Sequence, residues 1–210
     1  MDTPSETVLA IETSTHQGSV AVLHEGQFVF SESCGAGRSH SSLLFAVLER
    51  ALDSVPKGKK IDKIAVGLGP GSYAGVRIAI SAATGLGLAM GVDLVGLPSI
   101  VALGEGDYVA LGDARRESFY YALVRNGECV EGPVLLLATE LAQKLAGCSL
   151  PVIASEEIGA VIPAAIQFCF PCAERIAKLA AAGRSIVARG DLEPIYLREP
   201  HITTAKKTNA

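Results

Sequence analysis

Short apolar runs separated by polar turns open the chain. The runs Thr7–Ile11, Gly18–Leu23 and Gln27–Ser33 have the length and composition of strands. The polar tripeptide at 24–26, which ends in glycine, is short enough for a hairpin between the second and third runs. The pattern therefore predicts an antiparallel three-stranded meander at the start of the protein.

The hydrophobic period then changes to that of helices. Apolar side chains recur at helical spacing in Ser39–Asp53, and Ser39 can cap this helix. A strand is predicted at Ile61–Gly67, then a glycine-rich turn, a second helix that Ser72 can cap, and a strand at Leu94–Leu97. The second helix has no charged side chain from residue 78 to residue 92. Because a helix that is apolar all round is buried all round, we expect it to contact its own sheet and a second surface.

The second half of the chain resembles a shortened copy of the first. Glycine and acidic residues at 104–107 predict a hinge, and an Asn-Gly turn at 126–127 predicts a hairpin between strands at 118–125 and 128–130. A further strand is predicted from residue 108, another at 152–154, and helices at 140–146 and 173–182. The interpretation is an α/β protein with a first lobe at 1–104 (order βββαβαβ), a smaller second lobe at 105–198 and a flexible tail at 199–210.

Composition narrows the class of protein. Hydrophobic residues make up 49% of the 210 positions and charged residues 19%, which is typical of a folded, somewhat apolar protein. The net charge of −4 gives no reason to expect the chain to hold a polyanion by itself. The beginning of the chain has no secretory signal pattern, and the uncharged segment 78–92 is too short for a membrane span. Five cysteines without a regular framework suit reduced thiols, so a cytoplasmic protein is expected.

A nucleotide site is the first chemical hypothesis. A glycine turn before a helix can present N–H groups to a phosphate, and a polar turn after the first strand could lie beside it. The candidate residues are Glu12, Thr13, Ser14, Thr15, Gly69, Gly71 and Ser72. The spacing G-x-G-x-x-x-G matches neither the dinucleotide fingerprint nor a P-loop, and Asp113 in the second half is followed by Ala-Arg-Arg instead of a second glycine loop. A purely structural turn is therefore favoured on residue types alone.

Other catalytic patterns are weak or absent from the sequence. His40 has no second histidine one helical turn later, so no metal site is expected. No G-x-S-x-G motif for acyl transfer occurs. Cys169 and Cys172 have C-x-x-C spacing without the context of a redox centre, which favours coincidental thiols over redox sensitivity.

Taken together, these runs resemble the TsaB (YeaZ) family. The resemblance is carried by the runs 9–15, 67–87 (GLGPGSYAGVRIAISAATGLG), 113–116 and 194–198, and by His40 with the Leu-Leu pair after it. Tyr73-Ala74 replaces the more usual Phe-Thr, and Phe45 replaces a proline. The matches cover the chain from end to end in family order.

The resemblance implies an actin-like, ribonuclease-H-like (ASKHA) fold of two lobes with a reduced second lobe. It also implies a non-catalytic scaffold, without peptidase activity, that supports a TsaD-like protein in making threonylcarbamoyladenosine in tRNA. A TsaE-like ATPase, ATP or ADP and a metal would belong to the partner complex, tRNA would bind only through that complex, and the chain alone would form a homodimer. The expected subunit contacts are Leu44, Val47, Leu48, Ala51, Ile78, Ala82, Ala83, Leu86 and Met90. The alternative is an autonomous actin-like ATPase or small-molecule kinase that uses Glu12, Thr13 and Gly71.

Overall fold

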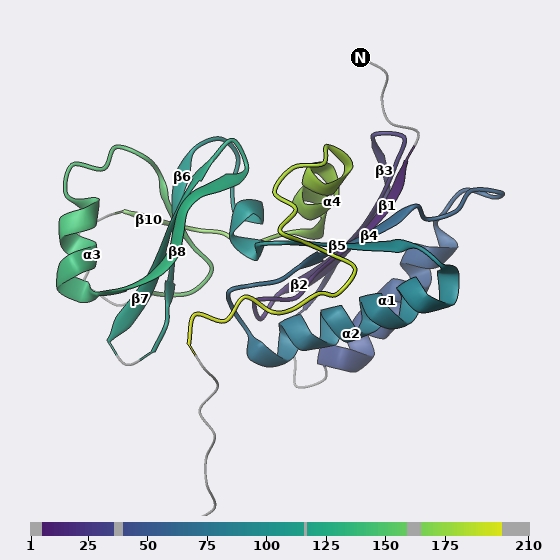
Figure 1. Cartoon of the computed structure of the whole chain (residues 1–210), viewed down its shortest axis with the longest axis horizontal. Coiled ribbons are helices and arrows are strands. Elements are labelled where there is room, and N and C mark those ends of the chain that lie inside the picture. The colour runs from purple at the N-terminus through teal and green to yellow at the C-terminus, as the bar shows by residue number, and fades with distance from the viewer. Residues whose placement is uncertain (1–5, 36–39, 116, 159–164, 199–210) are drawn as a thin grey trace, which may run out of the picture.

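The computed structural model describes residues 6–35, 40–115, 117–158 and 165–198. Two lobes lie end to end, each built on one mixed sheet (Figure 1). The strands of the first sheet have the order β11-β5-β4-β1-β2-β3. Their bounds are Thr7–Glu12 (β1), Gly18–His24 (β2), Gln27–Cys34 (β3), Lys63–Gly67 (β4), Asp93–Leu97 (β5) and Ala188–Arg189 (β11). β2 and β3 are antiparallel to their neighbours, so the predicted meander is confirmed, and β4 and β5 run parallel to β1.

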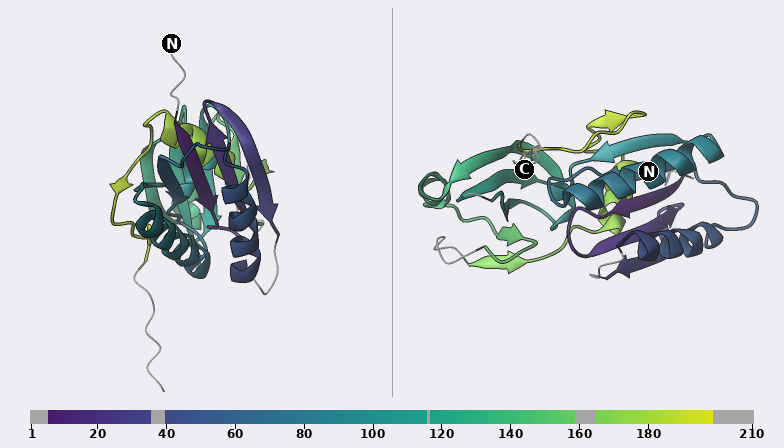
Figure 2. Two further views of the ribbon diagram at one scale, coloured as in Figure 1. Left: turned by 90° about the vertical axis from the view of Figure 1, so that its right-hand side faces the viewer. Right: turned by 90° about the horizontal axis from the view of Figure 1, so that it is seen from below.

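Helices cover both faces of the first sheet. α1 (His40–Asp53) and α2 (Tyr73–Met90) lie on one face, and α4 (Ala173–Ala181) lies on the other (Figures 1 and 2). Because side chains alternate along a strand, β1 supplies Leu9 and Ile11 to the core under α1 and α2, and Val8 and Ala10 to the core under α4. β1 is therefore the centre of a three-layer lobe and is buried from end to end.

The second lobe repeats the strand order of the first. Its sheet has the order β10-β9-β6-β7-β8, which is the same pattern as β5-β4-β1-β2-β3. The bounds are Tyr108–Asp113 (β6), Ser118–Arg125 (β7), Glu128–Leu137 (β8), Val152–Ala154 (β9) and Ile166–Phe168 (β10), with α3 at Ala138–Leu145 and a 3-10 turn, η1, at Ser99–Ala102. The two-lobed actin-like fold with a shorter second half is confirmed.

The predicted end of the second lobe is wrong. α4 and β11 fall in the range 105–198, yet α4 packs on the first sheet through Ile176 and Ala177, and β11 pairs with β5. The chain thus returns to the first lobe before residue 173. The alanine-rich face of α4 fits either sheet, and β11 has only two residues, so the local pattern could not assign them. The proposed tail at 199–210 lies outside the described residues.

The expected contact of α2 with its own sheet is confirmed, and its expected contact with a second surface stays a prediction. Val76, Ala79, Ala82, Ala83 and Gly87 are buried against the sheet, and the opposite side of the helix is exposed. α2 has eighteen residues, so by length and composition it reaches the minimum for a membrane span that the segment 78–92 did not reach. A core-facing helix meets the same criteria, and α2 does pack on β4 and β5.

Candidate functional site

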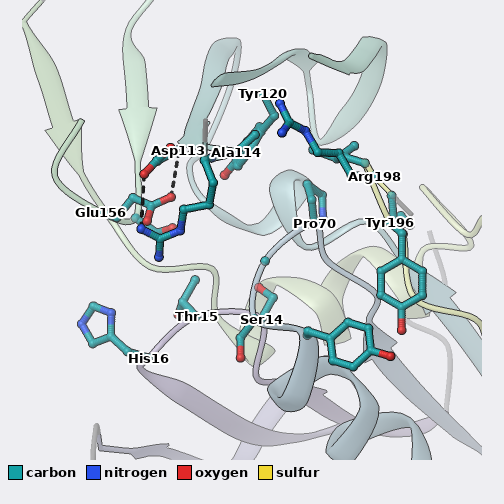
Figure 3. Close-up of a pocket in the computed structure, with 17 residues that line it drawn as sticks. Ser14, Thr15, His16, Pro70, Asp113, Ala114, Tyr120, Glu156, Tyr196 and Arg198 are labelled. Carbon is teal, nitrogen blue, oxygen red and sulfur yellow. Dashed lines mark hydrogen bonds and ion pairs between the residues drawn. The ribbon is translucent and has the colours of Figure 1, made fainter. Parts of the chain in front are cut away.

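A cleft of about 570 Å³ lies between the two lobes (Figure 3). We call it the interlobe cleft. The loop after β1, the turn before α2, the end of β6, the loop after β9 and the C-terminal segment line it. Its residues are Ser14, Thr15, His16, Pro70, Gly71, Ser72, Tyr73, Asp113, Ala114, Arg115, Tyr120, Ser155, Glu156, Ile195, Tyr196, Leu197 and Arg198.

The glycine turn before α2 is packed tightly against the end of β1. A Cβ atom on Gly71 would overlap the carbonyl oxygen of Ser14, and one on Gly75 would overlap that of Thr13. The Ser72 amide donates to the Ser14 carbonyl oxygen (2.6 Å), and the Thr13 hydroxyl donates to the Gly75 carbonyl oxygen (2.8 Å). Glycine is required here because side chains would prevent the close approach of the two backbones.

Three of the N–H groups around the glycine turn are used by the protein itself. The Gly69 amide donates to the Ser99 hydroxyl (2.9 Å), and the Ser72 amide donates to the Ser14 carbonyl oxygen. The Gly75 amide donates to the Ser72 hydroxyl (3.1 Å), which is the predicted helix cap. Phosphate binding at a helix start relies on such amides being available. The hydrogen bonds therefore favour the structural interpretation of the turn.

The candidate nucleotide residues divide into two groups. Ser14, Thr15, Gly71 and Ser72 line the interlobe cleft, whereas Glu12, Thr13 and Gly69 do not. The Glu12 side chain is fully buried, and its Oε1 accepts a hydrogen bond from the Ser14 amide (2.6 Å). Burial raises the pKa of Glu12, and the hydroxyls of Ser14 and Ser99 partly oppose this rise. The second oxygen of this carboxyl group is buried without a hydrogen-bond partner, and the side chain does not line the cleft.

The second-lobe wall of the cleft carries a small charged network. The Glu156 carboxylate accepts a hydrogen bond from the Asp113 amide (2.8 Å). Asp113 accepts one from the Arg115 amide (2.7 Å) and pairs with the Arg115 guanidinium at 3.5 Å (Figure 3). Asp113 is thus turned toward its own loop. Arg116 and the side chain of His40 lie outside the described residues.

Metal ligands do not cluster in the described parts of the chain. Within these ranges no group of three or more histidine, cysteine, aspartate or glutamate side chains is close enough to hold an ion. All five cysteines are free. Burial raises the pKa of the Cys172 thiol, the opposite of what a redox nucleophile needs, which favours the structural interpretation of the C-x-x-C spacing.

An aromatic cluster at the rim of the cleft was not predicted. The rings of Tyr73 and Tyr196 are stacked with centroids 5.3 Å apart, and the Arg77 guanidinium lies 4.0 Å from the Tyr73 centroid. The Arg77 Nε atom donates to the Tyr196 hydroxyl (2.7 Å). Both Tyr196 and Arg77 belong to runs that carry the family resemblance, but their sequence separation gives no sign that they meet. The cluster joins the C-terminal segment to the start of α2.

The predicted subunit contacts must be corrected. Six of them are buried in the protein's own core, namely Leu44, Val47, Leu48, Ala51, Ala82 and Ala83. Ile78 and Leu86 are half-buried, and Met90 is exposed. Leu43, Phe45 and Leu88 also face solvent on these helices, and the sequence analysis did not select them. Helical periodicity identified an apolar stripe, but that stripe belongs to the core.

We define the α1–α2 outer face as a set of exposed, mostly apolar or small residues of these two helices. Its residues are Leu43, Phe45, Ala74, Arg77, Ser81, Thr84, Gly85, Leu88, Ala89 and Met90. Leu88 is 81% exposed and Phe45 56%, and the intervening positions of α2 are small. Arg77 is the single charged residue of α2. The α2 part of the face is therefore uncharged apart from Arg77, whereas α1 also exposes Glu49, Arg50 and Asp53.

Two sheets of the same strand order on either side of a cleft define a protein of the actin-like fold. In this protein the Gly69 amide of the glycine turn is hydrogen-bonded within the protein. Residues 34–177 match the family model described as TsaD, tRNA N6-adenosine threonylcarbamoyltransferase. The chain belongs to this family, and within it to the TsaB (YeaZ) proteins.

Individual relatives agree with this assignment. An uncharacterized protein of Mycobacterium tuberculosis is 30% identical over 92% of each chain. The tRNA threonylcarbamoyladenosine biosynthesis protein TsaB of Escherichia coli is 30% identical over 58% of this chain and 56% of its own length. The solved structure of YeaZ from Pseudomonas aeruginosa superposes with a TM-score of 0.67 at 27% identity, covering 85% of this chain and 91% of its own. Similarity to YeaZ thus extends over both lobes.

Proposed function

We propose that the chain is a non-catalytic subunit that binds a TsaD-like threonylcarbamoyltransferase and supports it in forming threonylcarbamoyladenosine in tRNA. The observation that carries the proposal is the α1–α2 outer face. Leu43 and Phe45 are exposed on α1, and Leu88 and Met90 on α2. The two helices lie on the same face of the first sheet (Figure 2). An exposed apolar surface of this kind is characteristic of a protein interface.

The shape of this face suits packing against another pair of helices. Ser81, Thr84 and Gly85 present little side-chain volume beside Leu88, so a partner helix can approach the α2 backbone closely. Burial of one leucine contributes about 1.5–3 kcal/mol relative to exposure. A TsaD-like protein with a related first lobe would present the equivalent two helices. Two copies of this chain would pair in the same way when the partner is absent.

The remaining parts of the proposed assembly lie outside this chain. A TsaE-like ATPase, ATP or ADP and a metal ion are assigned to the partner complex, and tRNA to the complex as a whole. The glycine turn supports this division because three of its amides, those of Gly69, Ser72 and Gly75, already have partners within the protein. We assign the protein to the cytoplasm, where tRNA modification takes place, and expect neither peptidase activity nor membrane attachment.

Reconstitution tests the proposal directly. The purified chain is mixed with the TsaD-like and TsaE-like proteins of the same organism, tRNA, ATP and an activated threonylcarbamoyl donor, and the modified nucleoside is measured. Modification should require this chain, and the chain should bind the TsaD-like protein in sedimentation experiments. Full modification without the chain, or no binding between the two proteins, would overturn the proposal.

Titration calorimetry with Mg-ATP separates this proposal from the autonomous ATPase or kinase. The interlobe cleft lies where an actin-like enzyme holds its nucleotide, so nucleotide binding by the isolated chain has to be tested. Because Glu12 is buried behind the cleft wall, we expect neither micromolar binding nor turnover by the isolated chain. Micromolar binding accompanied by hydrolysis would favour the enzyme instead.

A further inference from the structure

A second and smaller pocket lies beside α4 and shares no residue with the interlobe cleft. It has a volume of about 260 Å³ and lies where α4, the hinge after η1 and the β7–β8 turn meet. We call it the α4 pocket. Glycines at 104, 106 and 127 form part of its wall, and the cationic side chains in it are Arg175, Lys178 and Arg184. α4 lies on the face of the first sheet opposite α1 and α2, so this pocket is separate from the α1–α2 outer face (Figure 1).

The central cation of the α4 pocket is largely withdrawn from water. The Arg175 side chain is 17% exposed, and its Nε atom donates to the Gly104 carbonyl oxygen (2.8 Å). Its Nη2 atom lies 2.9 Å from the Glu105 carboxylate. Burial lowers the pKa of Arg175, which means that the charged guanidinium is poorly solvated and gains from an anion.

The carboxylate that now faces Arg175 is weakly held. The Glu105 side chain is 89% exposed, and residue 105 stands between two glycines, of which Gly106 has a φ of +71°. An ion pair with so exposed a partner contributes little, typically about 0–1 kcal/mol. Glu105 can therefore leave Arg175 at small cost when a stronger anion arrives.

The other two cations reinforce the positive character of the pocket. Arg184 pairs with Glu128 (3.3 Å) and also donates to the Asn126 carbonyl oxygen. The Lys178 ammonium lies 5.4 Å from the Phe28 ring centroid, and it pairs with no carboxylate within the described parts of the chain. Asp107, the remaining acid near the hinge, accepts a hydrogen bond from the Asn126 amide (3.0 Å). One cation is therefore left without a counter-charge.

We propose that the α4 pocket binds a phosphate oxyanion, with Arg175, Lys178 and Arg184 as its partners and Glu105 as the carboxylate that it displaces. Guanidinium groups match the geometry of phosphate oxygens and bind them in pairs of hydrogen bonds. The pocket volume exceeds that of one phosphate, which leaves room for the rest of a phosphate ester. The phosphate comes either from a small molecule or from an RNA backbone. The site is independent of the function proposed above.

Titration calorimetry on the whole protein with inorganic phosphate tests the site. Lys178→Gln should weaken phosphate binding roughly tenfold, because a charge-assisted hydrogen bond is lost. Glu105→Gln should strengthen binding by up to about fivefold, since the competing carboxylate is removed. Arg189→Gln is the matched control, because Arg189 is exposed on β11 outside the pocket, and it should leave binding unchanged.

A single-stranded RNA oligonucleotide distinguishes the two sources of phosphate. An RNA backbone phosphate would be supported if the oligonucleotide binds more tightly than inorganic phosphate, if its binding depends on salt, and if Lys178→Gln weakens that binding. Binding of inorganic phosphate with no gain from the oligonucleotide would support a small phosphate ester. Absence of binding by both probes, or a Glu105→Gln variant that binds phosphate no better than the wild type, would overturn the proposal. Unchanged thermal unfolding of the variants shows that each remains folded.

Discussion

Replacing Leu88 with lysine should separate folding from subunit pairing. Leu88 is 81% exposed on the outward side of α2, so the folded monomer gains little from it. A lysine near the end of a helix also interacts favourably with the helix dipole. We expect the free energy of unfolding of the monomer to change by less than about 0.5 kcal/mol.

The same substitution should strongly weaken pairing. An interface that buries Leu88 would lose about 1.5–3 kcal/mol of apolar burial and would have to desolvate an ammonium group as well. A loss of at least about 2 kcal/mol corresponds to a roughly thirtyfold rise in Kd. The effect should be seen both for the TsaD-like partner and for the homodimer, since both are assigned to the α1–α2 outer face.

The assay combines urea unfolding with sedimentation velocity. Val130→Lys is the matched control, because Val130 is 53% exposed on β8 in the other lobe and the change introduces the same charge. Ala83→Lys marks the opposite case, since Ala83 is fully buried and the variant should unfold or lose several kcal/mol. Unchanged pairing of Leu88→Lys, or equal weakening by Val130→Lys, would refute the assignment of the interface.

Four further predictions concern the fold itself. Gly75→Ala should destabilise the protein by about 1–3 kcal/mol in urea unfolding, because the new methyl group overlaps the Thr13 carbonyl oxygen. Gly85→Ala should stabilise the monomer by up to about 1 kcal/mol, because its methyl group would have no neighbouring atom within 4 Å. Burial raises the pKa of Glu12 above its ordinary value of 4.5, so the folded state binds the proton more tightly and stability should fall as the pH rises from 4.5 through the folded-state pKa. Glu12→Gln should therefore flatten the dependence of Tm on pH across this range, and an unchanged profile would contradict the argument. Tyr108→Phe should cost about 1–2 kcal/mol in urea unfolding, because it leaves the buried Ile100 carbonyl oxygen without its 2.7 Å hydrogen bond.

Local sequence patterns were sufficient for the first lobe as far as β5. Each strand there is a short apolar run with a polar turn at its end, and each helix has an apolar period of its own. The glycines at 69 and 71 also predicted the turn before α2 correctly, because a close approach of two backbones requires glycine. The resemblance to a known family supplied the strand order, which the pattern alone could not.

Tertiary packing determines which side of α2 is buried and which sheet α4 covers, and local patterns do not show either. The outward and inward sides of α2 are both lined by small uncharged residues, such as Gly85 on one side and Ala83 on the other. The helical period of apolar residues does not show which of the two sides faces the core. The side of α2 that is buried was therefore predicted as the subunit contact. α4 was misplaced for a related reason, since the return of the chain to the first sheet depends on the fit of Ile176 and Ala177 between strands far away in sequence.

The closed glycine turn and the outer face of α2 are parts of one arrangement. Gly71 and Gly75 bring the start of α2 against the end of β1, and Gly87 brings its last turn against Leu94 of β5, where a Cβ atom would lie 2.8 Å from the leucine. α2 is thus held to the sheet at both ends. A surface that is already rigid loses less conformational entropy when a partner binds. The hydrogen bonds of the Ser72 and Gly75 amides therefore serve the proposed subunit contact, because they fix the start of the helix that carries it.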